Sequence, residues 1–435
     1  MVEQTLQAIR RSALFDQIGH GIHRYATDAA WRVPHFEKML YDQALFATVA
    51  VETFQATGDA RYRAMAEQTL EYMLRDLGAP GGAFHAAEDA ESEGREGAFY
   101  EWTETEVTEI AGTDAPLALA AWGIGGSTPG AALPRRAETI LELAKEFEVE
   151  TSAIETRLER ARLALLAARS ERPRPAKDRK ILTDWNGLAI AALSKAGAAF
   201  DERRYTDAAR NAADFILTRL RTGDGHLRHV FIGGRASVPA FLDDYAFLTE
   251  GLLDLYEASA EVKYLQAAVA LEADARRLFR EEATGVYFIA REGGQLPMRA
   301  VDGRDDELPA GSSAQLVNLV RLGRMTGDPG YEDRAEALTR ALSGEVSRAP
   351  EAATHFLLGV DFLLGPSFEI VLAGRADDGN MAALRREVFG RFVPNKVVLH
   401  RPPGTAPPIV KLAPFTEMQR SRAGIATAYV CVDFA

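Results

Sequence analysis

Leu242-Asp243-Asp244-Tyr245 begins an apolar run that ends at the turn Ser259-Ala260-Glu261-Val262-Lys263, after which Tyr264 begins a second helical pattern. The same order of apolar helix, short turn and Tyr occurs four times, with the aromatic residue at Tyr62, Tyr205, Tyr264 and Tyr331. Polar or capping residues open each first helix, at Pro34-His35-Phe36-Glu37, Thr183-Asp184-Trp185-Asn186, Leu242-Asp243-Asp244-Tyr245 and Pro309-Ala310-Gly311-Ser312-Ser313. Repeated helix pairs of this kind predict a stacked or closed array of helical hairpins.

The hydrophobic pattern differs between the two helices of each pair. The first helices are apolar almost all round, as at 188–193 and 246–255, which is typical of a helix buried on both sides. The second helices are amphipathic, with Arg203, Arg204 and Asp207 in the same stretch as Phe215 and Ile216. An inner ring of buried helices inside an outer ring of half-exposed ones is an α/α toroid. We therefore expect a mainly α fold in which the inner-helix starts converge around a central cavity.

The segments between and after the hairpins carry other patterns. Gly-rich returns at 81–85, 223–227 and 285–288 predict short strands on the rim where the inner helices begin. We expect 111–136 to be irregular and 151–169 to form a charged helix. After about residue 365 the pattern predicts strands at 368–373, 396–400 and 428–432 and a helix at 380–389. The predicted domains are a toroid at 1–365 and a small α/β appendage at 366–435 packed on it.

Composition excludes several functional classes. The 50 Lys and Arg residues and 63 Asp and Glu residues give a formal net charge of -13, which argues against nucleic acid and anionic membrane as partners. The single cysteine, Cys431, excludes a disulfide framework and a Cys-based zinc site. No apolar run approaches the roughly 18 residues of a membrane span, and residues 1–15 lack the features of a signal peptide. We therefore expect a cytoplasmic protein.

The first candidate site is the segment 31–42. His35, Lys38 and Asp42 would share one face if the segment is helical, and an imidazole beside a carboxylate suits acid/base catalysis near neutral pH. Trp31 and Glu37 belong to the same segment. The alternative is structural: Glu37 complements the helix dipole as a first-turn acid and His35 caps the helix.

The second candidate site is the acidic segment 84–102. His85, Asp89 and Glu91 are followed by Tyr100 and Trp102, which offer stacking faces for a sugar ring. Such a density of acids can hold a hard cation, form a glycosidase carboxylate pair or bind sugar hydroxyls. The alternative is a solvated acidic loop, and the absence of a regular ligand spacing argues against a metal.

Further candidates lie at the starts of the later inner helices. Asp184 and Asp243 are good N-caps, which leaves Asn186 and Asp244 to point into the cavity, and paired acids can drive their pKa values apart. His226 and His229 flank a predicted strand and are expected to be surface or packing residues. His20 and His23 lack an obvious third ligand, so we predict no metal site and no cofactor.

Several blocks of the chain resemble the thioredoxin-domain-containing YyaL-type family, which includes the animal spermatogenesis-associated protein 20. In chain order, the blocks are Asp16-Gln17-Ile18-Gly19 with His23-Arg24-Tyr25, Pro34-His35-Phe36-Glu37-Lys38-Met39-Leu40-Tyr41-Asp42, Gly97-Ala98-Phe99-Tyr100 with Trp102-Thr103, Leu182-Thr183 with Trp185-Asn186-Gly187-Leu188, and Phe241-Leu242-Asp243-Asp244-Tyr245-Ala246.

This resemblance implies a six-hairpin (α/α)6 toroid, similar to N-acylglucosamine 2-epimerases and six-hairpin glycosidases. The family's thioredoxin-like domain with its CxxC-type motif is expected to be absent here, and relatives usually continue beyond Ala435. A block of the type GNxEGxNIL is not recognisable between Trp122 and Leu141. The expected PSGNS reads Pro309-Ala310-Gly311-Ser312-Ser313, which makes Ser312 a substrate-binding candidate in an altered pocket.

Two hypotheses of function follow. The first is a carbohydrate-active protein that acts on a sugar or amino sugar by acid/base chemistry, as an epimerase or isomerase or as a glycosidase. Its catalytic candidates are His35, His85, Asp89, Asp184 and Asp244, and its substrate-binding candidates are Trp31, Glu37, Asp42, Glu91, Tyr100, Trp102, Trp185, Asn186, Tyr245 and Ser312. The second is a non-catalytic carbohydrate-binding or scaffold module associated with a thioredoxin-like domain or protein.

Overall fold

The chain divides into two compact units. A computed structural model describes residues 1–125, 130–223, 225–293 and 299–434. Unit 1 comprises Met1–Thr53, Asp59–Gly78 and Phe84–Arg179, and unit 2 comprises Phe54–Gly58, Ala79–Ala83 and Lys180–Ala435. Residues 366–435 fall in the same unit as the helices before them, so a domain boundary at 365 stays a prediction. Residues 126–129 of the segment predicted to be irregular and residue 224 of a predicted rim strand lie outside the described residues.

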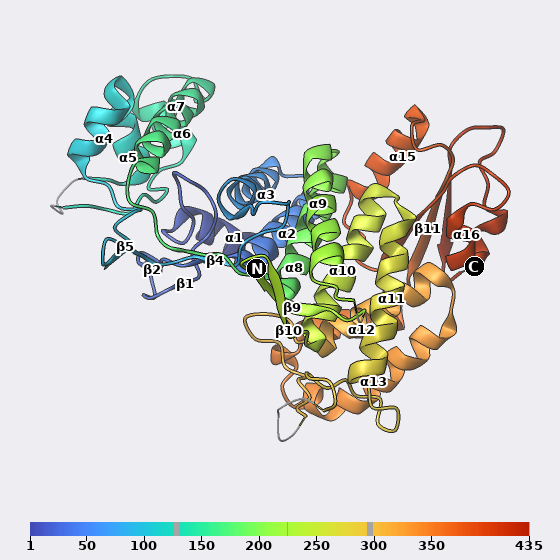
Figure 1. Cartoon of the computed structure of the whole chain (residues 1–435). Coiled ribbons are helices and arrows are strands. Elements are labelled where there is room, and N and C mark those ends of the chain that lie inside the picture. The colour runs from blue at the N-terminus through green and yellow to red at the C-terminus, as the bar shows by residue number, and fades with distance from the viewer. Residues whose placement is uncertain (126–129, 224, 294–298, 435) are drawn as a thin grey trace. The chain divides into compact units, whose positions relative to one another are not determined.

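Three helical hairpins form most of unit 2. They are α8 (Thr183–Phe200) with α9 (Arg203–Arg219), α10 (Leu242–Ser259) with α11 (Val262–Phe279), and α12 (Gly311–Thr326) with α13 (Pro329–Arg348) (Figure 1). Each first helix ends at a residue in the left-handed conformation, Asp201, Ala260 or Gly327. The Tyr that follows each turn is buried, as expected from the repeat.

The first helix of each hairpin is buried on nearly all sides, and the second buries one face. Helices α8 and α10 pack against each other with two glycines at the crossing. A Cβ on Gly187 would lie 2.5 Å from the carbonyl carbon of Phe247, and one on Gly251 would lie 2.4 Å from the carbonyl oxygen of Gly187. Only glycine at both positions allows the two backbones to approach so closely.

Short strands precede the inner helices of unit 2. Strand β8 (Ile181–Leu182) runs directly into α8 and pairs with β9 (Arg228–Ile232), which also pairs with β10 (Arg235–Pro239) just before α10. Each of the three predicted rim strands is instead a single antiparallel bridge, Gly78 with Phe84, Arg221 with Leu227 and Arg280 with Tyr287. The five-residue strands β9 and β10 follow the second of these returns and lie outside the predicted range.

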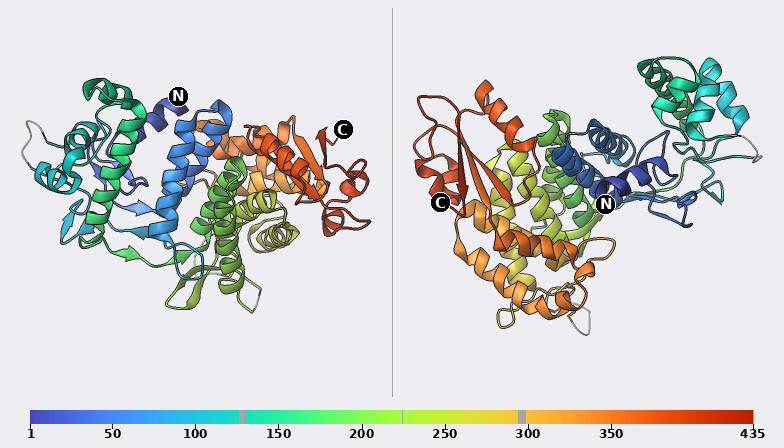
Figure 2. Two further views of the ribbon diagram at one scale, coloured as in Figure 1. Left: turned by 90° about the horizontal axis from the view of Figure 1, so that it is seen from above. Right: turned by 180° about the vertical axis from the view of Figure 1, so that it is seen from behind.

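The C-terminal part of unit 2 is a three-stranded sheet. Its order is β12 (Lys396–Arg401), β11 (Phe368–Ala373), β13 (Thr427–Val432), with β11 parallel to β12 and antiparallel to β13. Helix α15 (Gly379–Phe389) packs on it, and β12 contacts α10 and α12 (Figure 2). The shorter helices α14 (Thr354–Leu364) and α16 (Pro408–Leu412) complete this region. The predicted strands and helix of the α/β appendage are confirmed.

Unit 1 contains α1 (Val2–Arg11), α3 (Ala60–Tyr72), and most of α2 (Leu40–Thr57). A second group of helices packs around a core that includes Trp102, Trp122 and Leu165. It consists of α4 (Glu104–Ala111), α5 (Ala115–Trp122), α6 (Ile140–Glu146) and α7 (Thr151–Ser170). The charged helix predicted at 151–169 is confirmed, whereas α5 corrects the expectation that 111–136 is irregular.

The segment around His35 is extended, not helical. Strand β2 (Pro34–His35) pairs with β1 (Tyr25–Ala26), and β3 (Lys38–Met39) pairs with β4 (Ala87–Glu88) in a sheet that also contains β7 (Lys177–Asp178). A small hairpin of β5 (Glu91–Ser92) and β6 (Arg95–Glu96) lies in the same unit. The prediction that His35, Lys38 and Asp42 share a helical face is therefore wrong, because α2 begins only at Leu40.

The predicted fold class is confirmed: the chain is mainly α and built from helical hairpins, with short strands at the helix starts and a C-terminal α/β appendage. Among the described residues, no helix combines the length and the apolar character needed to cross a membrane.

Candidate active site

Two aspartates from neighbouring helices lie together in unit 2. Asp184 is in the first turn of α8 and Asp244 in the first turn of α10. The Asp244 carboxylate accepts the backbone N–H of Phe241 at 2.8 Å, which caps its own helix, and the backbone N–H of Asp184 at 3.2 Å, which ties it to α8. Both residues are buried, Asp244 completely and Asp184 with 8% of its surface exposed. The predicted convergence of inner-helix starts therefore holds for these two helices.

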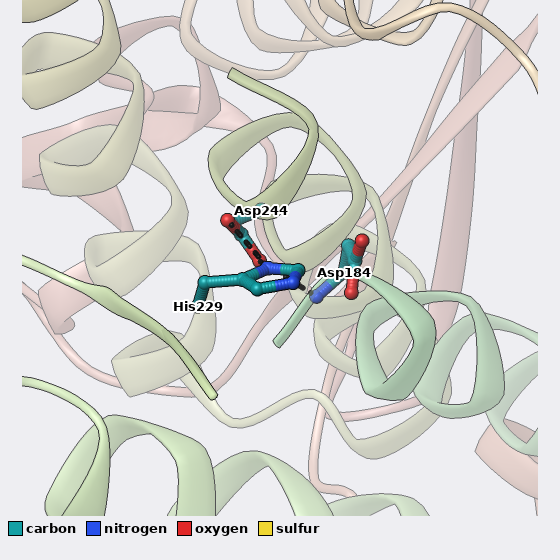
Figure 3. Close-up of side chains that lie close together, drawn as sticks. All are labelled: Asp184, His229 and Asp244. Atoms are coloured by element: carbon teal, nitrogen blue, oxygen red, sulfur yellow. Dashed lines mark hydrogen bonds and ion pairs between the residues drawn. The ribbon is translucent and has the colours of Figure 1, made fainter. Parts of the chain in front are cut away.

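A histidine completes the cluster. His229, on β9, donates from Nδ1 to the Asp244 carboxylate at 2.9 Å and 3.1 Å, and its side chain is 26% exposed. Figure 3 shows its ring between Asp244 and Asp184. One ring nitrogen of His229 and one carboxylate oxygen from each aspartate lie within 4.8 Å of one another. The expectation that His229 is a surface or packing residue is corrected, because the pairing of Val230 with Leu182 brings this histidine beside the start of α8.

The electrostatics of the cluster raise the pKa values of Asp184 and His229 and bring the two values close together. Burial and the nearby charge of Asp244 raise the pKa of Asp184 to about 8. Burial alone would lower the pKa of His229, but the hydrogen bond to Asp244 and the charges of Asp244 and Asp184 raise it to about 9. Between these two values the Asp184 carboxyl is ionised while the His229 imidazole is still protonated. A base and an acid of matched strength thus lie within reach of one reacting molecule.

The start of α12 adjoins the same cluster. The carboxylate of Asp243 accepts the backbone N–H of Gly311, where a Cβ would lie 2.1 Å from Asp243 Oδ1. Burial and the charges of Asp244 and Asp302 raise the pKa of Asp243 to about 6. Three inner-helix starts therefore meet around these acids.

Carboxylate and imidazole groups, the side-chain types of this cluster, also bind metal ions in some proteins. Asp244 uses both carboxylate oxygens to hold His229 Nδ1, so a metal ion would have to displace this hydrogen bond. We therefore treat the cluster as a site for protons and assign no metal to it.

The other predicted site residues of unit 2 lie near the starts of α8, α10 and α12, and they differ in how exposed they are. Trp185 is half-buried, and its backbone N–H donates to Asp184 Oδ1 at 2.8 Å. Asn186 is buried and its amide donates to the Leu182 carbonyl at 2.8 Å. Tyr245 is buried with its hydroxyl accepting the Leu227 N–H, and Ser312 is buried in the first turn of α12. Of these, Trp185 presents the most surface to a ligand.

In unit 1, His35 has carboxylates at both ring nitrogens. Nδ1 lies 2.7 Å from Glu96 Oε1 and Nε2 lies 3.1 Å from Glu37 Oε2. Neither nitrogen is left as a proton acceptor. Lys38, by contrast, is fully buried, with Nζ 2.8 Å from Asp16 Oδ2. This part of the predicted site is therefore a network of paired charges.

The remaining predicted residues of unit 1 do not gather around one group. Asp89 and Glu91 are exposed, and the Asp89 carboxylate accepts the N–H of Ala90 in a local turn. His85 Nδ1 lies 3.2 Å from the carbonyl oxygen of Arg179. Trp31 and Asp42 are half-buried, Tyr100 is buried, and the Trp102 ring is buried with the Arg172 guanidinium 3.8 Å from its centroid. A sugar could stack on Trp102 only if the Arg172 guanidinium moved away from the ring.

No protein-family model matches the chain. Spermatogenesis-associated protein 20 from Homo sapiens is 33% identical over 474 residues, covering 100% of this chain and 60% of that protein. The protein of the same name from Mus musculus is 31% identical over 469 residues, covering 99% of this chain and 59% of its own length. The chain thus spans about three fifths of the length of these curated relatives.

Among solved structures, a sugar epimerase from a ruminal bacterium is similar with a TM-score of 0.44 and 10% identity, covering 79% of this chain and 86% of that one. The sequence similarity to the mammalian proteins extends along essentially the whole chain. The chain is therefore a homologue of spermatogenesis-associated protein 20 over the span that it covers.

Proposed function

We propose that this chain catalyses proton transfer at the carbon next to the carbonyl group of an open-chain sugar or amino sugar, as an epimerase or isomerase. The observation that carries the proposal is the Asp184–His229–Asp244 cluster, in which a carboxyl with a pKa of about 8 lies beside an imidazole with a pKa of about 9. Abstraction of a proton from carbon is most efficient when the pKa of the base lies near the working pH, above that of an ordinary carboxylate. Burial beside a second carboxylate makes Asp184 such a base.

Each side chain then has a distinct task. The Asp184 carboxylate takes the proton from carbon, and the electron pair left behind moves onto the carbonyl oxygen. The His229 imidazolium donates a hydrogen bond to that oxygen and stabilises its negative charge. Asp244 is a positioning residue, because its hydrogen bond holds the His229 ring and keeps it protonated. For an isomer, Asp184 returns the proton to the former carbonyl carbon while His229 protonates the former carbonyl oxygen and takes up the proton of the neighbouring hydroxyl, which becomes the new carbonyl. For an epimer, the planar intermediate turns over in the site, so that Asp184 returns the proton to the same carbon on its opposite face.

The exposure of the cluster agrees with these tasks. His229 and Asp184 retain access, at 26% for the His229 side chain and 8% for Asp184, whereas Asp244 is fully buried behind them. The half-buried ring of Trp185 follows Asp184 in the chain and offers an apolar face for the carbon side of a sugar.

Hydrolysis of a glycoside fits the hydrogen bonds of the cluster less well. Glycosidases use a pair of carboxyl groups that flank the bond to be cleaved. In this cluster Asp244 is already committed to His229 and to two backbone N–H groups. This leaves one free carboxyl rather than the pair that hydrolysis requires.

The test is hydrogen exchange at carbon in D₂O. The full chain is incubated with a panel of aldoses, N-acyl amino sugars and disaccharides, and NMR follows deuterium entering the position next to the carbonyl. We expect exchange with at least one sugar, and its loss in Asp184→Asn and His229→Gln. Asp377→Asn, an exposed aspartate of unit 2 paired with Arg375, is the matched control and should exchange like the wild type.

Three outcomes would refute the proposal. Release of a reducing sugar without exchange would indicate a glycosidase. A rise in melting temperature with sugars but no turnover would indicate a binding module. Exchange that vanishes with a chelator and returns with a divalent cation would replace the proton mechanism with a metal-dependent one.

A further inference from the structure

A cavity of unit 2 lies between the loop after α11 and the helix α13. It measures about 400 Å³, and its lining includes Arg280, Thr284 and Arg340. None of the three residues of the Asp184 cluster lines it. Its size is within the range of small-molecule sites, at the lower end of about 300–1,000 Å³.

Arg280 supplies the main observation. Only 8% of its side chain is exposed, and its Nη1 donates to the carboxylate of Glu282. The buried Nε–H has no hydrogen-bond acceptor among the described residues. Buried guanidinium hydrogens are nearly always paired, so Arg280 keeps one hydrogen-bond donor that the described residues leave unused.

The other donors around the cavity are cationic or backbone groups. Arg340 reaches it from α13, and Arg276 lies behind Glu282, with Nε 3.1 Å from Glu282 Oε1. In the described part of the chain, the backbone N–H groups of residues 282–284 donate to no acceptor. Guanidinium groups and free backbone N–H groups together are the donors that recognise phosphate oxygens.

The Glu282 carboxylate is the negatively charged group that Arg280 and Arg276 bind at this site. Its side chain is 64% exposed, and the hydrogen bonds from Arg280 and Arg276 lower its pKa. A flexible, exposed carboxylate held by two guanidinium groups can be replaced by a ligand of higher charge. A carboxylate ligand would offer only what Glu282 already offers, whereas a phosphate group adds charge and further acceptor oxygens.

We propose that this cavity binds the phosphate group of a phosphorylated small molecule of sugar size, with Arg280 and Arg340 as ligand-binding residues and Glu282 as an internal competitor. The site is separate from the Asp184 cluster, and the proposal does not depend on the reaction proposed there.

Isothermal titration calorimetry of the full chain tests this, with glucose 6-phosphate, inorganic phosphate and glucose as probes. We expect glucose 6-phosphate to bind more tightly than inorganic phosphate, because the cavity is larger than the phosphate group alone. Arg340→Gln should raise the Kd for glucose 6-phosphate about tenfold, as loss of one charge-assisted contact implies. Glu282→Gln should lower that Kd several-fold, because the competing charge is gone.

The controls separate this site from others. Glu336→Gln removes the exposed partner of Arg340 one turn away on α13 and should leave binding at the wild-type level or slightly tighter. Asp184→Asn should leave the Kd for glucose 6-phosphate unchanged, so failure of the proposed reaction and failure of this site are distinguishable. No binding at about 10 mM ligand, or weaker binding by Glu282→Gln in a protein with a native circular dichroism spectrum, overturns the proposal.

Discussion

Replacing Asp184 with Asn tests the electrostatics of the cluster without knowledge of any substrate. Asn has nearly the same shape but cannot ionise. The pKa of Asp184 rises from 3.8 to about 8 on folding, because the carboxylate is buried beside Asp244. Between these values the folded chain holds a proton that the unfolded chain has released. The stability from this proton is complete below the unfolded pKa and is lost as the pH rises through the folded one.

The expected size follows from proton linkage. Each pH unit between the two pKa values lowers the free energy of unfolding by ~1.4 kcal/mol for one proton. Integrated from pH 5 to pH 7 with a folded pKa of about 8, the wild type should lose ~2.6 kcal/mol through Asp184 alone. The raised pKa of His229 has the same sign, because its folded state also holds a proton longer, and Asp184→Asn removes only the part of that rise that comes from the charge of Asp184.

The assay is urea denaturation of wild type and Asp184→Asn across this pH range, followed by circular dichroism and tryptophan fluorescence. The two curves of unfolding free energy against pH should diverge steadily, with the variant the more stable at the higher pH. Asp377→Asn, at an exposed position, should run parallel to the wild type. If Asp184→Asn also runs parallel, then Asp184 is ionised at neutral pH and the argument for a strong base fails.

Three other predictions concern packing, buried charge and catalysis. Gly251→Ala should lower the free energy of unfolding by about 1–3 kcal/mol, because its Cβ would lie 2.4 Å from the Gly187 carbonyl oxygen; thermal denaturation measures this, and Gly379→Ala, with open space around it, is the control. Asp16→Asn should destabilise the fold by about 3–5 kcal/mol in urea denaturation, because it leaves Lys38 and a neighbouring arginine buried without a counter-charge. The rate of the proposed exchange should peak between pH 8 and pH 9, where the base is ionised and the acid protonated, and a maximum near pH 6 would contradict the assignment.

The hairpins could be predicted because their signals are local. An apolar helix, a left-handed residue such as Gly327 and a capping residue such as Asp328 all lie within one short stretch of sequence. The strands of the C-terminal sheet are runs of β-branched and apolar residues, and their bounds agree within a residue or two. The start of α2 was misplaced because residues 34–39 pair with strands at 25–26 and 87–88, which no local pattern reveals.

The candidate site could be predicted only in part, because only its two aspartates follow from the repeat. Asp184 and Asp244 stand at equivalent positions of two successive inner helices, so the repeat alone brings them together. His229 reaches them through the register of β9 on β8, which depends on residues almost 50 positions apart. A useful signal was available: β8 leads straight into α8, so polar residues on its partner strand approach the helix start. The pKa values depend on burial, which the sequence does not give.

The crossing of α8 and α10 has a chemical consequence. Gly187 lies one turn beyond Asp184, and Gly251 lies two turns beyond Asp244. Because neither glycine has a side chain, the backbones of the two helices come into contact. This close approach brings the carboxyl groups of Asp184 and Asp244 near enough to repel each other when both are charged. The part of the proton affinity of Asp184 that comes from Asp244, added to the larger effect of burial, thus depends on two glycines outside the cluster. A methyl group added at either glycine would widen the gap between the helices, weaken the repulsion and lower the pKa of Asp184, without altering one atom of the site.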